Sequence, residues 1–275
     1  MTASPCRNDG SGIVMESLFG PVILRMSYEE AQLAGMVTPM KYAMLSCKWA
    51  PSICQKEDIS EVLLKRYAYW QNTVRNKAIA DFIYKIHAAD KDAQILIVCG
   101  VLEHAIALHQ MLPFFKVAYY GGSDLADVSK HFPKEKYPNL DINSYKMTQK
   151  QLDIMRAAFA KGTLKWVIST LVFRQGVSFN NLRILVRADG ATSEIMGIQI
   201  PGRLARLHEG KDYGYLIDID DTGCAWAKRR TICREKLYEE QKWTKVAPED
   251  IIHDFIGKTT TDSSPDTGPA GTEES

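Results

Sequence analysis

The chain has 275 residues, of which 45% are hydrophobic and 24% are charged, and its formal net charge is +1. These proportions are typical of a globular protein with one large or two small domains, and they exclude a collagen, a disulfide scaffold and a wholly disordered chain. The near-neutral balance also argues against a strongly basic nucleic-acid coat protein.

The chain opens with residues rich in Gly, Asn, Asp and Ser, a composition that predicts a loop. Beyond them, apolar runs typical of strands alternate with helical patterns. We expect strands at 41–47, 95–100, 116–122, 166–171, 182–189 and 214–220, and helices at 59–89, 103–112, 149–160, 193–206 and 225–241.

Several expected strands are continuously apolar rather than alternating, as in ILIV (95–98), WVIST (166–170) and LRILV (182–186). Such runs indicate strands that are buried on both faces of a parallel sheet. The pattern therefore predicts an α/β fold, with a parallel sheet covered by helices on both faces. An N-terminal extension precedes this sheet and a basic helix follows it.

Charge is distributed unevenly toward the C-terminal end. Residues 228–245 hold seven Lys or Arg against three Glu, which fits either a basic binding patch or the solvated face of a helix. Residues 258–275 hold four acidic side chains, one Lys and no large apolar residue. Because such a segment cannot offset its own ordering entropy, we expect a disordered acidic tail.

Nothing in the sequence predicts a metal site or a membrane span. The six cysteines form no CxxC pair and match no zinc spacing, so we expect reduced thiols and no bound metal. His104 and His109 are five residues apart and would be a poor metal pair. The N-terminus is no signal peptide, and no apolar run approaches the roughly 18 residues of a membrane helix. We expect a soluble, intracellular chain.

The most informative segment is GIQIPGRLARL (197–207). On a continuous helix, Gln199, Arg203 and Arg206 would project within about 60° of one another. Paired arginines suit charge-assisted binding of phosphate oxygens, and they can neutralise charge that develops on a transferred phosphoryl group. An exposed helix face that makes ordinary salt bridges is the alternative.

Two neighbours shape this segment. Gly202 would let a backbone or ligand approach closely. Pro201 disfavours helical conformation at the residue before it and removes one hydrogen bond, so the helix begins or kinks there.

The pattern Gln199-x-x-Gly202-Arg203-x-x-Arg206 resembles motif VI, QxxGRxxR, of superfamily 2 helicases. Upstream segments resemble other parts of that family in its order, across about residues 2–245. These are 2–12 (motif III), 19–40 (a counterpart in the phage-type and restriction-type branch), 72–83 (the helix that opens the second RecA-like domain), 95–112 (motif IV), 119–124 (the strand-to-loop step) and 151–190 (through motif V).

The resemblance implies a RecA-like sheet and three regions. Residues 1–58 would be a motif III remnant and linker, 59–257 the helicase C-terminal RecA-like domain, and 258–275 the acidic tail. The family's first domain, with its P-loop and DExD/H box, has no counterpart here. A GKT occurs at 257–259, but Ile252 stands where the first Gly of a P-loop belongs, and no Asp is followed directly by Glu. The chain therefore looks like a C-terminal half, beginning where the first domain should end.

Roles at the nucleotide follow from the resemblance, residue by residue. Arg203 and Arg206 would be arginine fingers that meet the γ-phosphate of ATP, and Gln199 would contact that phosphate or the attacking water. Gly176, Ser178 and Gly202 would line the ATP site. Many family members have Asp where this chain has Ser178, and the lost charge puts nucleotide coupling in question.

Roles at the nucleic acid follow in the same way. Thr170 would touch the strand backbone, with Gly100 and His104 near the same strand. For His104, packing against the domain is the competing interpretation.

These roles imply an ATP-dependent helicase or translocase, with DNA the expected strand and RNA not excluded. It would depend on a P-loop-bearing half that holds most of the ATP and Mg²⁺, and it would be inactive alone. We expect it in the cytoplasm of a bacterial or phage-infected cell, in replication, recombination or repair.

Two other functions stay open. In a non-catalytic binding module, residues 228–245 would hold nucleic acid or protein, and Tyr238 and Trp243 would either stack on bases or pack the helix onto the domain. An unrelated α/β nucleotide-binding enzyme would need a Gly-rich turn after its first strand, which GVLEH (100–104) does not supply.

Overall fold

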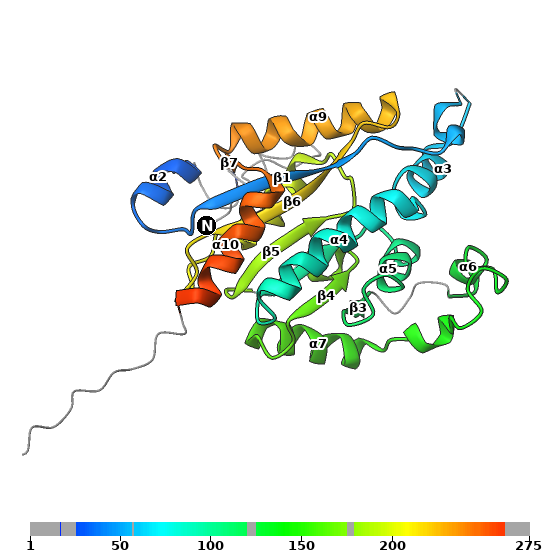
Figure 1. Cartoon of the computed structure of the whole chain (residues 1–275), viewed down its shortest axis with the longest axis horizontal. Helices are drawn as coiled ribbons and strands as arrows, with labels where there is room; N and C mark the ends of the chain where they lie inside the picture. The colour runs from blue at the N-terminus through cyan, green and yellow to red at the C-terminus, as the bar shows by residue number, and fades with distance from the viewer. Residues whose placement is uncertain (1–16, 18–25, 57, 120–124, 175–178, 262–275) are drawn as a thin grey trace, which may run out of the picture.

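One parallel sheet organises the chain in the computed structural model, which describes residues 17, 26–56, 58–119, 125–174 and 179–261 (Figure 1). Within these residues, seven strands lie in the order β3-β4-β2-β5-β6-β1-β7, and each neighbouring pair is parallel. The strands are β1 (Met40–Cys47), β2 (Gln94–Val98), β3 (Lys116–Ala118), β4 (Trp166–Ser169), β5 (Leu182–Arg187), β6 (Gly214–Asp221) and β7 (Thr244–Lys245).

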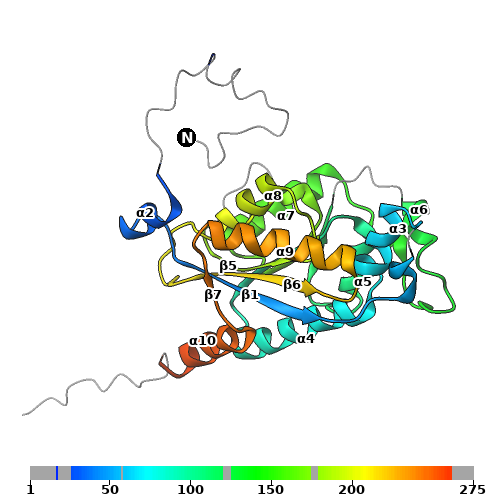
Figure 2. The same cartoon turned by 90° about the horizontal axis from the view of Figure 1, so that it is seen from above.

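Helices cover both faces of this sheet (Figure 2). One face carries α4 (Thr73–Ala89), α5 (Leu102–His109) and α10 (Pro248–Thr261), and the other carries α7 (Gln149–Lys161), α8 (Glu194–Gln199) and α9 (Ala225–Glu240). The shorter helices are α2 (Tyr28–Leu33), α3 (Glu61–Lys65) and α6 (Leu125–Ser129).

The strand side chains alternate between two apolar cores. In β2, Ile95 and Ile97 belong to the core beneath α4, whereas Leu96 and Val98 belong to the core beneath α7 and α9. All four are at most 3% exposed. Burial on both faces explains the continuous apolar runs, and it confirms the predicted α/β class.

The helix expected over 59–89 is interrupted. α3 runs into a π-helical turn, η2 (Arg66–Trp70), and α4 begins separately at Thr73. Asn72 caps α4, because its side-chain Oδ1 accepts a hydrogen bond from the Arg75 backbone N–H at 3.1 Å.

β1 lies inside the sheet rather than outside it. It pairs with β6 across eight residues and with β7 on its other side. The predicted domain boundary at residue 58 would therefore separate β1 from the sheet to which it belongs.

Two further findings concern the C-terminal region and membranes. α10 continues to Thr261, three residues past the expected start of the acidic tail at 258, and residues 262–275 lie outside the described part. Within the described ranges, no helix has both the length and the apolar character needed to span a bilayer.

Candidate functional site

The motif VI segment, residues 199–206, follows β5 and α8. α8 ends at Gln199, and a 3₁₀ turn, η5 (Pro201–Arg203), comes next. The helix expected over 193–206 is interrupted at Pro201, where the sequence indicated a start or a kink, because Pro201 cannot donate the hydrogen bond that would continue α8. Gln199 and Gly202 are exposed, and a Cβ at Gly202 would meet no atom within 4 Å.

Arg203 sits on an aromatic ring at the end of η5. Its Cζ lies 5.3 Å from the centroid of Phe179, and the residue is 9% exposed. Burial, assisted by the nearby charge of Arg206, lowers the pKa of Arg203. This cation–π contact favours the charged guanidinium at this position.

A buried lysine adjoins the motif VI segment. Lys211 is 7% exposed, and its Nζ donates to the carbonyl oxygens of Arg206 at 3.1 Å and Asn180 at 3.4 Å. Burial, followed by the charges of Arg183 and Arg206, lowers the pKa of Lys211 to about 8.

Arg183 and Lys211 were missed from the sequence. Arg183 donates to the Gly210 carbonyl at 2.7 Å, in the loop after the motif VI segment, whereas Lys211 donates to the last carbonyl of that segment, Arg206. In the described part of the chain, neither Arg206 nor Lys211 forms an ion pair with a carboxylate. The arrangement can therefore receive an anion.

Two of the residues predicted to bind nucleic acid, Gly100 and Thr170, lie at the C-terminal ends of neighbouring β-strands. Gly100 follows β2 and Thr170 follows β4, and these strands are parallel neighbours. The Cys99 N–H donates to the Ser169 carbonyl at 2.8 Å, which ties the two strand ends together. Both Gly100 and Thr170 are partly exposed.

His104 does not lie on this surface. It is fully buried in α5, and its Nε2 is 3.1 Å from Asn76 Oδ1. Burial lowers the pKa of His104 well below its usual value, so the ring is neutral near pH 7. The prediction that His104 contacts nucleic acid does not fit this position, and packing against α4 accounts for it.

Gly176 and Ser178 lie outside the described residues, so their predicted places at the nucleotide stay predictions. In the described part of the chain, no group of three or more His, Cys, Asp or Glu side chains is placed to hold a metal ion.

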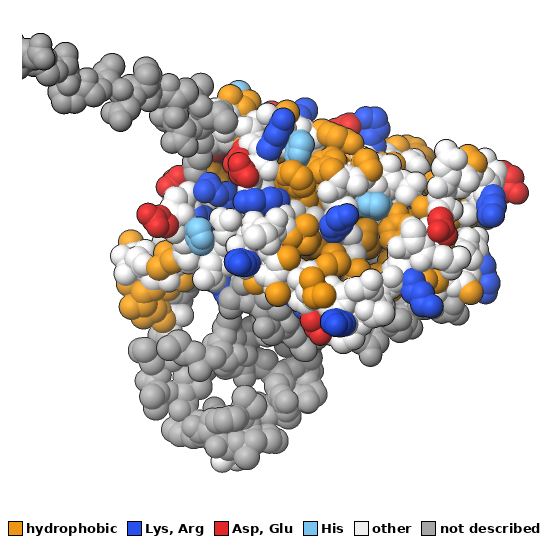
Figure 3. Space-filling model, turned by 90° about the horizontal axis from the view of Figure 1, so that it is seen from below, with side chains coloured by type: hydrophobic (Ala, Val, Ile, Leu, Met, Phe, Trp, Pro, Cys, Tyr) orange, Lys and Arg blue, Asp and Glu red, His pale blue; other side chains and the backbone are white. Residues whose placement is uncertain are grey.

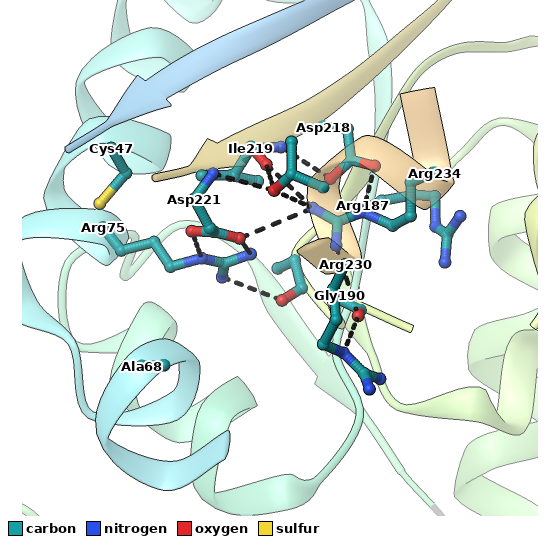
Figure 4. Close-up of polar contacts among 12 residues, drawn as sticks. Cys47, Ala68, Arg75, Arg187, Gly190, Asp218, Ile219, Asp221, Arg230 and Arg234 are labelled. Carbon is teal, nitrogen blue, oxygen red and sulfur yellow. Dashed lines mark hydrogen bonds and ion pairs between the residues drawn. The ribbon is translucent and has the colours of Figure 1, made fainter. Parts of the chain in front are cut away.

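A buried network of arginines and aspartates contacts the loop of residues 188–193, which joins β5 to α8 (Figure 4). Arg75 from α4 donates to both carboxylate oxygens of Asp221 at 2.8 and 3.3 Å, and to the Ala188 carbonyl at 2.9 Å. Arg234 from α9 donates to Asp218 at 2.8 Å. The ion pairs of the network are Arg75–Asp221, Arg234–Asp218, Arg234–Asp221 and Arg187–Asp189.

Arginines of α9 bind the backbone of this loop at Gly190. Arg230 and Arg234 both donate to the Gly190 carbonyl, at 3.3 and 3.5 Å. Gly190 has φ of +63°, and a Cβ there would lie 2.5 Å from the Tyr69 ring. The path toward the motif VI segment therefore requires glycine at this position. Scattered Arg and Asp residues gave no sequence signal of this clustering.

The basic stretch 228–245 is divided by burial. Lys228, Arg229 and Lys236 are exposed on α9, whereas Arg234 belongs to the buried network. Tyr238 and Trp243 are the two aromatic candidates for base stacking.

These two rings are buried and stacked on each other, with centroids 5.4 Å apart. They pack α9 onto the sheet, so of the two alternatives for these rings packing fits and base stacking does not. Figure 3 shows the side of the molecule opposite to α9, and on that face Lys and Arg side chains are scattered among apolar ones.

No family model and no curated protein sequence matches this chain significantly. Several solved structures do resemble this chain. S. cerevisiae Dbp5 bound to RNA and ADP BeF3 is 13% identical with a TM-score of 0.53, and the match covers 92% of this chain and 54% of that one. A fragment of a putative HsdR subunit of a type I restriction enzyme from Vibrio vulnificus is 20% identical with a TM-score of 0.51, over 82% and 39% of the two chains.

These likenesses show the fold. The chain has a RecA-like α/β fold, which confirms the fold class that the sequence predicted. It spans about half the length of Dbp5 and less of the restriction subunit fragment.

Proposed function

We propose that this chain is the second RecA-like domain of an ATP-dependent helicase or translocase that acts on nucleic acid, with DNA the expected strand. One observation carries the proposal. Arg206 lies near both Arg203 and the buried Lys211, and no described carboxylate pairs with Arg206 or Lys211. A cationic cluster of this kind favours a polyanionic ligand such as the triphosphate of ATP.

In this proposal, the two arginines reach ATP that is held by another half. They neutralise negative charge as the γ-phosphoryl group is transferred to water, and the exposed Gln199 orients that water or the phosphate. Mg²⁺ would be held mainly by the P-loop and DExD/H box of the other half. Without that half, the arginines have no bound ATP on which to act.

The nucleic acid would bind at the C-terminal ends of β2 and β4, where Gly100 and Thr170 lie. Their places after neighbouring parallel strands support this assignment. Closing and opening of the two halves during ATP hydrolysis would then move the domain along the strand. We place the protein in the cytoplasm of a bacterial or phage-infected cell, in replication, recombination or repair.

The test is ATP hydrolysis in the presence of single-stranded DNA. The chain is assayed alone and then with the polypeptide that carries the P-loop and DExD/H box. We expect activity only in the mixture, and loss of about two orders of magnitude or more with Arg203→Ala. Lys85→Ala removes an exposed cation on α4 to which no role is assigned; it is the control and should keep full activity.

A non-catalytic binding module is the second candidate, and the exposed cations of α9 favour it. Binding of single-stranded DNA is then measured against salt concentration. Affinity that survives Arg203→Ala but falls with Lys228→Ala and Arg229→Ala supports the binding module. Affinity that is insensitive to the α9 variants contradicts it.

A further inference from the structure

The C-terminal end of the motif VI segment is held by residues from elsewhere in the chain. Thr38, which precedes β1, is 1% exposed. Its backbone N–H donates to the Ala205 carbonyl at 2.8 Å, and its Oγ1 donates to the Arg206 carbonyl at 3.0 Å. One threonine thus binds two consecutive carbonyls of the motif VI segment, from 168 residues away for the side-chain contact.

Two more residues complete this attachment. The ammonium of Lys211 also donates to the Arg206 carbonyl, so that oxygen accepts hydrogen bonds from both Thr38 and Lys211. Gly214, at the start of β6, packs directly against Leu204, because a Cβ at position 214 would be 2.7 Å from the Leu204 carbonyl oxygen. The carbonyls of Ala205 and Arg206 are therefore held by hydrogen bonds, and that of Leu204 is packed against Gly214.

This attachment matters because the segment has little regular structure of its own. η5 spans three residues, and its end is closed by the Leu204 N–H donating to the Pro201 carbonyl at 2.7 Å. A short 3₁₀ turn has poorer hydrogen-bond geometry than an α-helix. The direction in which Arg206 projects is then set by the contacts of its backbone with Thr38 and Lys211.

Thr38 also links the motif VI segment to the chain upstream of the sheet. Its own carbonyl accepts from the Tyr28 hydroxyl at 3.2 Å, and the next residue, Pro39, accepts from the Gly214 N–H at 2.9 Å. Tyr28 is the first residue of α2. Residues 28–39 and the motif VI segment are therefore joined directly by hydrogen bonds.

We propose that Thr38 and Lys211 are positioning residues that hold Arg206 toward a phosphate of the bound nucleotide. The proposal rests on the proposed function, and it adds the residues that orient the second arginine. It also makes the segment before β1 part of the nucleotide site, since a displacement of Thr38 would move the carbonyl that it binds.

The test uses inorganic tripolyphosphate as the probe and the full chain alone. Binding is followed by the ¹⁵N NMR signals of the arginine Nε–Hε groups, assigned to Arg203 and Arg206 through Arg→Lys variants. Thr38→Val keeps the shape and the backbone N–H but removes the hydroxyl, whereas Thr38→Ser keeps the hydroxyl. We expect tripolyphosphate affinity to fall about fivefold to tenfold in Thr38→Val, and to stay within about twofold of wild type in Thr38→Ser.

Lys211→Met provides a second variant if Thr38→Val unfolds. It should lower the affinity by a similar factor and shift the Arg206 signal in the absence of tripolyphosphate. Equal losses in Thr38→Val and Thr38→Ser would overturn the proposal, because the hydroxyl would not be the cause. Unchanged affinity in both Thr38→Val and Lys211→Met would overturn it as well.

The same titration separates this proposal from the proposed function. If the wild-type Arg203 and Arg206 signals do not respond to tripolyphosphate, the phosphate-binding role fails, and the positioning role fails with it. If they respond and Arg203→Ala weakens binding while the Thr38 and Lys211 variants match wild type, only the positioning role is overturned.

Discussion

Replacing Asp218 by Asn should destabilise the fold strongly. Asp218 is fully buried, and it accepts from Arg234 Nε at 2.8 Å, the Tyr238 hydroxyl at 2.6 Å and the Ile219 N–H at 2.7 Å. Burial alone would raise the pKa of Asp218, but Arg234 and Arg187 outweigh it and hold the pKa below its usual value. The side chain is therefore a carboxylate at neutral pH, and Asn removes its charge with little change in shape.

The expected loss follows from the contacts that Arg234 keeps. Breaking a buried ion pair by removing one partner costs about 3–5 kcal/mol, because the other charge stays buried. Arg234 still donates to the Ile219 carbonyl at 2.9 Å and lies 3.6 Å from Asp221, so we expect the lower value, about 3 kcal/mol. For a chain of this size, that loss lowers Tm by about 6–10 °C.

Urea and thermal unfolding followed by circular dichroism would measure the loss. Asp81→Asn is the matched control, because Asp81 forms an exposed pair with Lys77 and its loss should cost less than about 1 kcal/mol. The wild-type advantage over Asp218→Asn should be full above about pH 4 and should shrink as pH falls further, since the folded-state pKa is the lower one. Equal losses for Asp218→Asn and Asp81→Asn at pH 7 would refute the reasoning.

Three further predictions test other parts of the structure. Burial and two neighbouring arginines lower the pKa of Lys211 to about 8, so the unfolded chain binds its proton to higher pH than the folded chain does. Relative to Lys211→Met, wild-type stability in urea should therefore rise between pH 8 and pH 10, by at most about 3 kcal/mol. Gly214→Ala should cost about 1–3 kcal/mol in the same assay, because its Cβ would lie 2.7 Å from the Leu204 carbonyl oxygen. Iodoacetamide at pH 8 should label the exposed Cys233 and leave the fully buried Cys99 unmodified in the folded chain, as peptide mass spectrometry would show.

Much of the fold was predictable because its signals are local. Continuous apolar runs predicted strands buried on both faces, and β2, β4 and β5 overlap the expected ranges. Polar spacing at Gln199, Arg203 and Arg206 led to the motif VI segment. Pro201 indicated a break there, but periodicity alone still predicted one helix, since periodicity does not weigh a lost hydrogen bond.

The rest depended on contacts between distant residues. Thr38 reaches the Arg206 carbonyl from 168 residues away, and Lys211, although only five residues from Arg206, belongs to no motif that would mark it. His104 opened an apolar helical pattern, and only the packing of α5 against α4 shows that it is buried. The buried arginine–aspartate network likewise joins α4, β5, β6 and α9 through residues that look like ordinary surface charges in the sequence.

The central claim is that Arg203 acts on ATP held by another RecA-like half. The most direct measurement is the ATPase rate with single-stranded DNA for the chain alone, for the P-loop-bearing polypeptide alone and for the two together, each with wild-type and Arg203→Ala chain. We predict hydrolysis only in the wild-type mixture, with the Arg203→Ala mixture at the level of the P-loop polypeptide alone. Robust hydrolysis by this chain alone, or equal rates in the two mixtures, would contradict the account.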